Sequence, residues 1–312
     1  MEVFDADGGA VRQARVHAAG MRLFVAEYGP PDGDALFLLH GLAAHGGVWR
    51  RVAPHLAARG LRVLAPDLPG HGLSDGKRHR GTYTPRFFAR SLLALADAMG
   101  LERFHLAGNS LGGLVAARAA LLAPERVQRL VLVDSAGLGR PGVPWRTRLM
   151  YLPFALSAVL GVSPSPLAVR LFLQRAVVAD PAQAAELSDL LHRRPPLPVA
   201  VRRSALALLG PEGSVADELP RLALPTLLVW GDRDPQFPLA LARAAVERMP
   251  RARLAVVAGA GHVPQWEAPE AVAALIGDEV APAAAVPPPD PGGRADPPPR
   301  RLRPRRPIRR RT

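Results

Sequence analysis

Short, wholly apolar runs alternate with longer segments of helical periodicity along the first half of the chain. Residues 36–39 and 61–65 are two such runs. A strand that is apolar on both faces belongs in a sheet that is covered on both sides. Residues 85–99, by contrast, repeat apolar side chains at the three- to four-residue spacing of a helix. The alternation predicts an α/β fold with a mostly parallel sheet and helices on both faces.

The same pattern extends along most of the chain. Two half-polar extended runs near the start, separated by a short turn, are typical of a hairpin. Further apolar runs predict strands, and periodic segments between them predict helices. The hairpin is expected at residues 11–17 and 21–28, further strands at 104–107, 127–133, 226–230 and 253–257, and further helices at 111–122, 239–249 and 269–276.

The alternation stops at residue 138 and resumes near residue 221. Between these points the pattern predicts proline-punctuated helices and no strand, which indicates a helical cap inserted into an α/β core. The four expected helices span residues 145–160, 166–178, 181–192 and 198–209. We therefore divide the chain into a first part of the core (1–137), a helical cap insertion (138–220), a second part of the core (221–280) and a tail (281–312).

The tail differs from the rest of the chain in composition. Residues 281–312 contain ten prolines, nine arginines and two aspartates, with almost nothing that could form a core. Such a segment is expected to be disordered. It carries about half of the formal charge of +13. We interpret this charge as compositional bias and solvation; a contact of the tail with nucleic acid or an acidic membrane surface is the alternative.

Composition limits the chemistry that the chain can perform. Its 312 residues are 48% hydrophobic and 21% charged, which is ordinary for a globular protein. It has no cysteine, so disulfides, thiolate metal sites and a cysteine nucleophile are excluded. Acidic residues stand at the start where a signal peptide needs basic ones, and no apolar run reaches the ~18 residues of a membrane span. We expect a cytoplasmic protein.

The pattern G-x-S-x-G occurs at residues 108–112, between a predicted strand and a predicted helix. This is the context of a nucleophile elbow, in which a sharp turn exposes the serine hydroxyl. Ser110 is therefore the candidate nucleophile. Its hydroxyl needs a neighbouring histidine as base and a carboxylate that orients the histidine.

The candidate partners of Ser110 follow later strands in the order acid, then histidine. Asp234 and His262 each follow a predicted strand, so both should lie at the same edge of the sheet as Ser110. We assign Asp234 as the acid and Asp232 as the residue that turns its loop. Asp134, at the end of another strand, is a weaker alternative for the acid.

An anionic transition state also needs hydrogen-bond donors. The backbone N–H groups of Leu111, which follows Ser110, and of Leu42 are the candidates for the oxyanion hole. His40 is expected to shape the loop that contains Leu42, and residues 67–75 to support the site as a tight polar loop.

Together these ordered motifs resemble the α/β-hydrolase fold superfamily, in particular its members with a helical cap. The resemblance covers residues 11 to about 278. It implies an eight-stranded sheet whose second strand is antiparallel, a cap over the site, and Ser110, Asp234 and His262 as the catalytic triad. Residues 108–113 and 265–267 are similar to those of the meta-cleavage product hydrolases, which break carbon–carbon bonds. Val263 and residues 42–44 depart from that group, and carboxylesterases and lactonases share the remaining pattern.

The function expected from the sequence is therefore that of a serine hydrolase. It would cleave a hydrophobic ester or lactone through an acyl-enzyme, with water as co-substrate and no metal or organic cofactor. Carbon–carbon bond hydrolysis is the alternative reaction, and a non-catalytic small-molecule receptor is the alternative of another class. Trp145, Phe154 and Phe172 suggest an apolar chamber, with packing of the cap helices against one another as the alternative. The arginine pairs at 193–194 and 202–203 are expected to be solvated; contact with a substrate carboxylate is the alternative.

Overall fold

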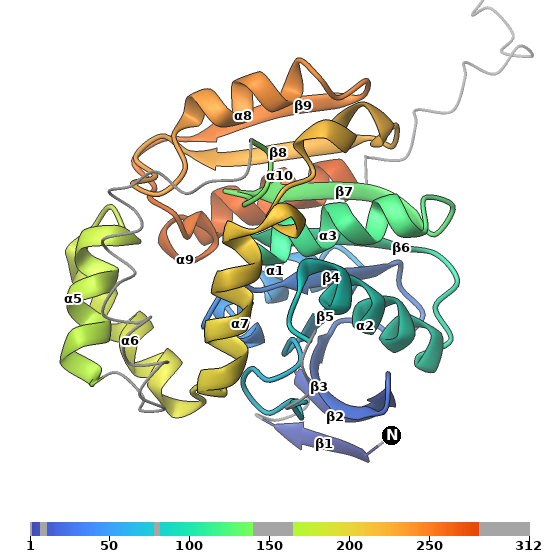
Figure 1. Ribbon diagram of the computed structural model, residues 1–312. Coiled ribbons are helices and arrows are strands. Elements are labelled where there is room, and N and C mark those ends of the chain that lie inside the picture. The colour runs from blue at the N-terminus through green and yellow to red at the C-terminus, as the bar shows by residue number, and fades with distance from the viewer. Residues whose placement is uncertain (1, 7–10, 78–81, 140–164, 281–312) are drawn as a thin grey trace, which may run out of the picture.

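A nine-stranded sheet organises the protein in the computed structural model, which describes residues 2–6, 11–77, 82–139 and 165–280 (Figure 1). The strand order is β1-β2-β3-β5-β4-β6-β7-β8-β9. The strands are β1 (Glu2–Ala6), β2 (Val11–Ala18), β3 (Met21–Tyr28), β4 (Ala35–Leu39), β5 (Arg62–Pro66), β6 (Phe104–Asn109), β7 (Val127–Val133), β8 (Thr226–Gly231) and β9 (Ala252–Val257).

Strands β2 to β9 confirm the eight-stranded, mostly parallel sheet expected from the sequence. The second of these eight, β3, runs antiparallel to both β2 and β5, while the pairs from β5 to β9 are parallel. Strand β1 is an addition that the sequence pattern did not predict. It pairs antiparallel with β2 at the edge of the sheet, where backbone hydrogen bonds form irrespective of an alternating side-chain pattern.

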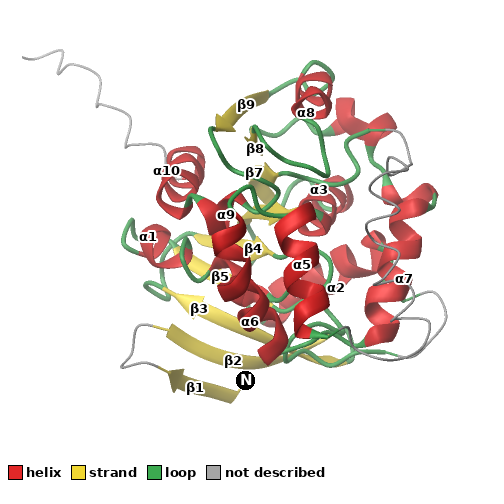
Figure 2. Ribbon diagram, turned by 90° about the vertical axis from the view of Figure 1, so that its left-hand side faces the viewer, coloured by secondary structure: helices red, strands yellow, loops and turns green. Residues whose placement is uncertain are grey.

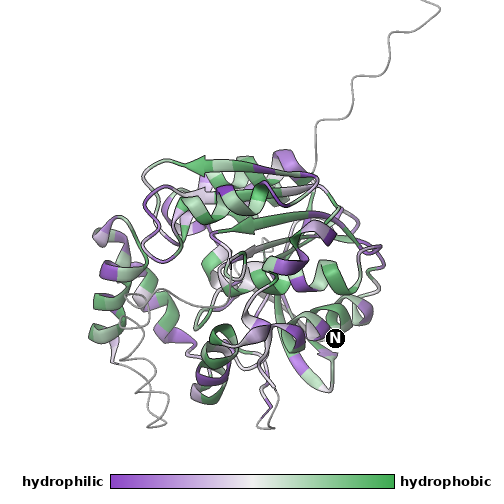
Figure 3. Ribbon diagram, turned by 45° about the horizontal axis from the view of Figure 1, so that its top comes forward, coloured by the Kyte–Doolittle hydropathy of each residue, from purple (hydrophilic) through white to green (hydrophobic). Residues whose placement is uncertain are grey.

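Helices cover both faces of the sheet, as the apolar strands require. One face packs against α2 (Pro85–Ala98), α3 (Leu111–Leu122) and α8 (Leu239–Val246), and the other packs against α1 (Ala53–Ala57) and α10 (Pro269–Val280) (Figure 2). The hydropathy colours show the strands of the sheet as mostly apolar, whereas the outer helices mix apolar and polar residues (Figure 3).

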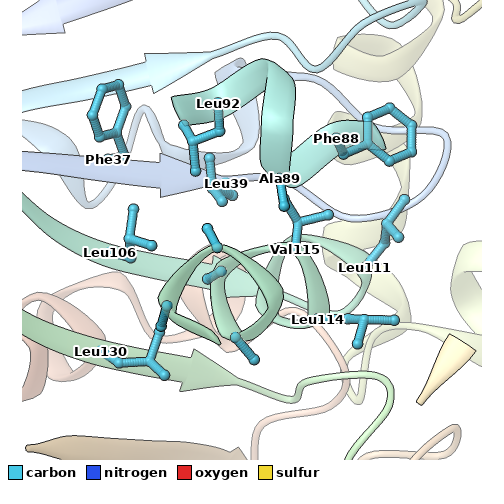
Figure 4. Packing of buried hydrophobic residues seen from close by; sticks show 14 of the residues in the cluster. Phe37, Leu39, Phe88, Ala89, Leu92, Leu106, Leu111, Leu114, Val115 and Leu130 are labelled. Atoms are coloured by element: carbon cyan, nitrogen blue, oxygen red, sulfur yellow. The ribbon is translucent and has the colours of Figure 1, made fainter. Parts of the chain in front are cut away.

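Strand β4 shows why both faces need cover. Phe37 and Leu39 belong to the hydrophobic cluster under α2 and α3, while Leu36 and Leu38 belong to the cluster on the opposite face, and all four are fully buried. Figure 4 shows the first cluster, in which side chains of α2 and α3 surround Leu39. At ~1.5–3 kcal/mol for each fully buried aliphatic or aromatic side chain, these two clusters hold the end of β4 and the loop that follows it in place.

The described residues between β7 and β8 form helices and no strand from residue 165 to 221; we call this segment the insertion. Two of its three longer helices begin with a proline, whose missing N–H has no partner to lose in the first turn of a helix. The third follows a short 3₁₀ turn that itself begins with a proline. They are α5 (Pro166–Ala176), α6 (Ala184–Arg193) and α7 (Pro198–Leu209), with the 3₁₀ helices η2 (Pro181–Gln183), η3 (Pro211–Gly213) and η4 (Ala216–Arg221). Residues 140–164, with the expected helix at 145–160, and the tail from residue 281 lie outside the described residues, so the domain boundaries stay predictions.

Polar contacts fix the insertion to the core. Glu186 of α6 forms ion pairs with Arg50, at 2.6 Å, and with Arg51. His45, which precedes the 3₁₀ helix η1 (Gly46–Trp49), donates from Nε2 to the carbonyl oxygen of Leu190 at 3.1 Å. Since exposed ion pairs contribute only ~0.2–1 kcal/mol each, the half-exposed Glu186 pairs guide the docking of α6 more than they stabilise it. No helix in the described part of the chain has the length and apolar character needed to cross a membrane.

Candidate active site

Ser110 occupies the turn between β6 and α3 in a strained backbone conformation. Its φ is +55°, in the left-handed region that costs a non-glycine residue ~1–3 kcal/mol. The turn is tight because glycines flank it: a Cβ on Gly108 would lie 2.3 Å from the carbonyl oxygen of Gly112, and one on Gly112 would lie 2.3 Å from that of Leu39. Ser110 is therefore held at the end of β6, where it lines a cavity.

Asp234 and His262 meet at the ends of β8 and β9. Nδ1 of His262 lies 2.9 Å from Oδ2 of Asp234, whose side chain is fully buried. Oδ1 of Asp234 accepts hydrogen bonds from the N–H groups of Gln236, at 2.7 Å, and Phe237, at 3.1 Å. Burial by itself raises the pKa of Asp234, but the charge and hydrogen bond of His262, with the other donors, bring that pKa below its ordinary value.

The ionised Asp234 determines which imidazole nitrogen carries the proton. A carboxylate only accepts hydrogen bonds, so Nδ1 of His262 is the donor and Nε2 is free of a proton in the neutral ring. Asp232, in contrast, is exposed and accepts from the N–H of Gly259 at 2.7 Å. It joins the two loops that contain Asp234 and His262, whereas the side chain that turns the β8 loop is that of Asp234, through the N–H groups of Gln236 and Phe237.

Asp134 lies beside this pair, where the sequence offered it only as a weaker alternative for the acid. It is fully buried at the end of β7, and its Oδ1 accepts from the N–H of Gly231 at 3.1 Å. Ligand-type atoms of Asp134, Asp234 and His262 all lie within 4.8 Å of one another. Such a set could hold a metal ion, but Nδ1 of His262 and Oδ2 of Asp234 are already hydrogen-bonded to each other.

Two side chains that the sequence reasoning missed connect the loop of His262 to its surroundings. Nδ2 of Asn109 donates to the carbonyl oxygen of His262 at 2.9 Å. Glu267, in α9 (Pro264–Glu267), accepts from the N–H of Gly261 at 3.0 Å with one oxygen and from the N–H of Ala179 in the insertion at 2.6 Å with the other. Asn109 occupies a variable position of G-x-S-x-G, and Glu267 lies in the 265–267 motif, so only the resemblance drew attention to either position.

The backbone groups expected to form an oxyanion hole flank Ser110. Leu111 is the first residue of α3, and a Cβ on Gly41 would lie 3.3 Å from that of Ser110, which places the loop containing Leu42 directly against it. Within residues 11–77, 82–139 and 165–280, the N–H groups of Leu42 and Leu111 donate no hydrogen bond. Both therefore remain candidates to bind a negative oxygen.

His40 is occupied by its own loop. Its Nδ1 donates to the carbonyl oxygen of Gly41 at 2.8 Å, and its Nε2 accepts from the N–H of Leu68 at 2.9 Å. Burial, helped by the neighbouring His71, brings the pKa of His40 well below its ordinary value, so the ring is neutral. This agrees with the role of loop former expected from the sequence.

The cavity that Ser110 lines has a volume of about 220 Å³ and lies between the core and the insertion. The core contributes Ser110, His262, Gln265 and residues 41–44, while the insertion contributes mostly apolar side chains. The latter include Val169, Phe172, Leu173, Leu187, Leu191 and Val201. Phe172 thus lines the chamber as expected, while Trp145 and Phe154 fall outside the described residues. No arginine or lysine is among the described lining residues, and the pairs at 193–194 and 202–203 lie elsewhere.

Gln265 is a further residue that the sequence reasoning did not single out as functional. It lines the cavity and is fully buried, and neither its Oε1 nor its Nε2 has a hydrogen-bond partner among the described residues. An unpaired buried amide costs ~1–3 kcal/mol. The cavity thus combines an apolar wall with a few polar groups near Ser110.

Comparison with known proteins places this arrangement in a family. A family model described as alpha/beta hydrolase fold matches residues 34–269. The chain is 36% identical over 272 residues to the dihydrolipoyllysine-residue acetyltransferase component of the acetoin cleaving system of Pseudomonas putida, covering 86% of this chain and 68% of that protein. It is 31% identical over 262 residues to a 2-hydroxy-6-oxo-6-phenylhexa-2,4-dienoate hydrolase of Burkholderia cepacia, covering 80% and 88%.

A solved structure shows the same relationship. A mutant of the meta-cleavage product hydrolase CumD of Pseudomonas fluorescens IP01, complexed with acetates, superimposes with a TM-score of 0.70 at 27% identity, covering 85% of this chain and 96% of that one. The family match covers far more than half of the chain, and the sheet has the expected order and directions. The chain belongs to the α/β-hydrolase fold family.

Proposed function

We propose that this protein is a serine hydrolase that cleaves an uncharged, hydrophobic ester or lactone through an acyl-enzyme intermediate. The observation that carries the proposal is the 2.9 Å contact between His262 and a buried, ionised Asp234, in a cavity that Ser110 also lines. The small substrate and water are the only reactants that the mechanism needs.

The reaction proceeds in two halves. Oγ of Ser110 attacks the acyl carbon while Nε2 of His262 takes the hydroxyl proton, and the N–H groups of Leu42 and Leu111 bind the developing oxyanion. Collapse of the tetrahedral intermediate breaks the bond to the alkoxy oxygen, which receives the proton from His262. Water then attacks the acyl-enzyme with His262 again as base, releasing the acid and restoring the Ser110 hydroxyl.

The lining of the cavity supports an uncharged substrate. Its described walls carry mostly apolar side chains, neutral amides, the hydroxyl of Ser110 and the imidazoles of His192 and His262, and no arginine, lysine, aspartate or glutamate. A buried charge without a partner is strongly disfavoured. The relative from Burkholderia cepacia is named for a dienoate, an anionic substrate. Carbon–carbon bond hydrolysis is therefore the second candidate. The similarity to that protein favours it, whereas the lack of an arginine or lysine among the described lining residues speaks against it.

A matched pair of substrates tests the proposal. p-Nitrophenyl butyrate and the p-nitrophenyl monoester of succinate have acyl chains of equal length, but only the second has a carboxylate. We expect kcat/KM to be lower for the charged ester by on the order of 100-fold, since the charge finds no partner. Ser110→Ala should abolish both activities. Ser91→Ala, in α2, is the control because Ser91 lies outside the cavity lining and its hydroxyl donates to the carbonyl oxygen of Phe87 in the same helix.

Two outcomes would contradict the proposal. Faster cleavage of a 2-hydroxy-6-oxo-dienoate than of any neutral ester would favour carbon–carbon bond hydrolysis. Binding of neutral esters without turnover would favour a non-catalytic receptor.

A further inference from the structure

Two carboxyl groups, those of Asp134 and Asp234, lie close to each other and to the imidazole of His262, although a catalytic triad uses only one acid. Both the backbone and the side chain of Asp134 bind to β8. Its N–H donates to the carbonyl oxygen of Val229 at 3.0 Å, and its Oδ1 accepts from the N–H of Gly231 at 3.1 Å. Its φ is +41°, a strained value for a non-glycine residue. The chain thus holds the Asp134 carboxyl against Asp234 at a conformational cost.

The charges around this pair do not balance if both carboxyls are ionised. Glu267 adds a further negative charge nearby, and His262 is the one side chain with a cationic form that pairs with the cluster in the described residues. Two buried carboxylates in contact cannot both stay ionised, since burial and mutual repulsion favour a proton on one of them. One proton must therefore be shared within the cluster.

The donors around each group determine where that proton resides. Asp234 accepts from two backbone N–H groups, those of Gln236 and Phe237, and from Nδ1 of His262. Asp134 accepts from the single N–H of Gly231. Donors stabilise the ionised form of a carboxyl group, so Asp234 is the carboxylate and Asp134 carries the proton. In agreement, burial and the charge of Asp234 raise the pKa of Asp134 well above its ordinary value.

We propose that Asp134 is a protonated positioning residue whose O–H donates a hydrogen bond to the carboxylate of Asp234. With two N–H groups on one side and the Asp134 hydroxyl on the other, the Asp234 carboxylate can face only His262. The catalytic consequence rests on the function proposed above, whereas the protonation of Asp134 does not. Asp134 is not among the residues that line the cavity, so it acts through Asp234.

An infrared measurement on the unmutated protein tests the protonation directly. Incorporation of aspartate labelled with ¹³C in its side-chain carboxyl group moves every aspartate band and leaves glutamate bands in place. In D₂O at pH 7 we expect a labelled carboxylic-acid C=O band, which ordinary aspartates do not show at that pH because their pKa is ~3.9. Absence of this band would overturn the proposal, whatever the enzyme's activity. A band that persists in Asp134→Asn would overturn it as well.

Two substitutions separate a protonated acid from a second catalytic carboxylate. Asparagine keeps the size of a protonated aspartate and can donate to Asp234, so Asp134→Asn should retain kcat within about tenfold. Asp134→Ala removes the donor and should lower kcat by on the order of 100-fold with little change in KM, since this residue does not line the cavity. Thermal melting of both variants verifies that they are folded.

Rescue by asparagine is the decisive activity result. If Asp134→Asn loses activity as severely as Asp234→Asn, Asp134 works as a carboxylate and the proposal is wrong. If the wild-type protein shows the infrared band but hydrolyses no ester, the proposed function fails while the assignment of the proton stands.

Discussion

The side chain of Asn109 donates a hydrogen bond to the carbonyl oxygen of His262, 2.9 Å away, although 153 residues separate the two in sequence. Nδ2 of Asn109 also donates to the carbonyl oxygen of Val133 at 3.2 Å. The residue before the candidate nucleophile therefore sets the position of the loop that contains the candidate base. Such a contact makes the distance between Ser110 and His262 depend on Asn109.

Replacing Asn109 by alanine should impair both activity and stability. The carbonyl oxygen of His262 loses its donor, whereas that of Val133 keeps the N–H of Ser110. A buried unsatisfied group costs ~1–3 kcal/mol. We expect the free energy of unfolding in urea to fall by about that amount and kcat to fall by about tenfold as His262 loses its fixed position. Ser91→Ala serves as the control, and an Asn109→Ala variant with wild-type kcat would show that the loop of His262 is held by other contacts.

The two aspartates of the β8 loop should respond very differently to the same substitution. Asp234→Asn keeps the shape of the site but replaces the acceptor of the His262 Nδ1 proton, which in comparable triads costs ~10⁴ in rate. Asp232→Asn retains an oxygen for the N–H of Gly259 and should lower kcat by less than about threefold. Ester hydrolysis at saturating substrate measures both. If Asp232→Asn proves the crippled variant, the acid is assigned to the wrong residue.

Glu267 should be required as a carboxylate, because both of its oxygens accept backbone hydrogen bonds. Glu267→Gln turns one acceptor into a donor that faces the N–H of either Gly261 or Ala179. We expect a loss of ~1–3 kcal/mol in the free energy of unfolding and a reduced kcat. Glu270→Gln, on the exposed side of α10, is the matched control. Equal stability of the two variants would contradict the structural role given to Glu267.

Buried His71 should make stability depend on pH. Burial lowers the pKa of His71 to about 4, against 6.5 for an ordinary histidine. Between these values the unfolded chain binds a proton that the folded one does not, so the stability present above pH 6.5 is lost as the pH falls toward 4, by ~1.4 kcal/mol per pH unit. The raised pKa values of Asp134 and Glu267 act with the opposite sign.

A substitution isolates the contribution of His71. The asparagine of His71→Asn cannot take up the proton. Between pH 7 and pH 5, the free energy of unfolding measured in urea should therefore fall by about 2 kcal/mol less in this variant than in the wild type. His17→Asn, at an exposed position, should leave the pH dependence as in the wild type. Identical slopes for His71→Asn and the wild type would contradict a neutral, buried His71.

The parts of the fold that sequence predicts well are those set by local periodicity. Strand β4 is apolar and buried at every position, and the turn at Ser110 needs two glycines whose Cβ atoms would collide with backbone. The antiparallel edge strand β1 escaped prediction because pairing at an edge depends on backbone hydrogen bonds to β2 rather than on side chains.

The site shows the same division between local and long-range information. The order of Ser110, Asp234 and His262 along the chain follows from strand ends, and the structure places Asp234 and His262 in contact. The role of Asn109 and the contact of Asp134 with Asp234 arise from segments that are about 100 or more residues apart, so no local spacing encodes them. The cavity, likewise, is formed by side chains of the core and the insertion together.

Covalent labelling tests the central claim, that Ser110 is the activated nucleophile, most directly. A fluorophosphonate probe reacts with a serine only when a base activates its hydroxyl. We predict that intact-mass analysis shows one probe per chain, that fragmentation maps it to Ser110, and that Asp234→Asn slows the labelling greatly while Ser91→Ala does not. Absence of labelling in the wild-type protein, or a probe attached to a serine other than Ser110, would contradict the account.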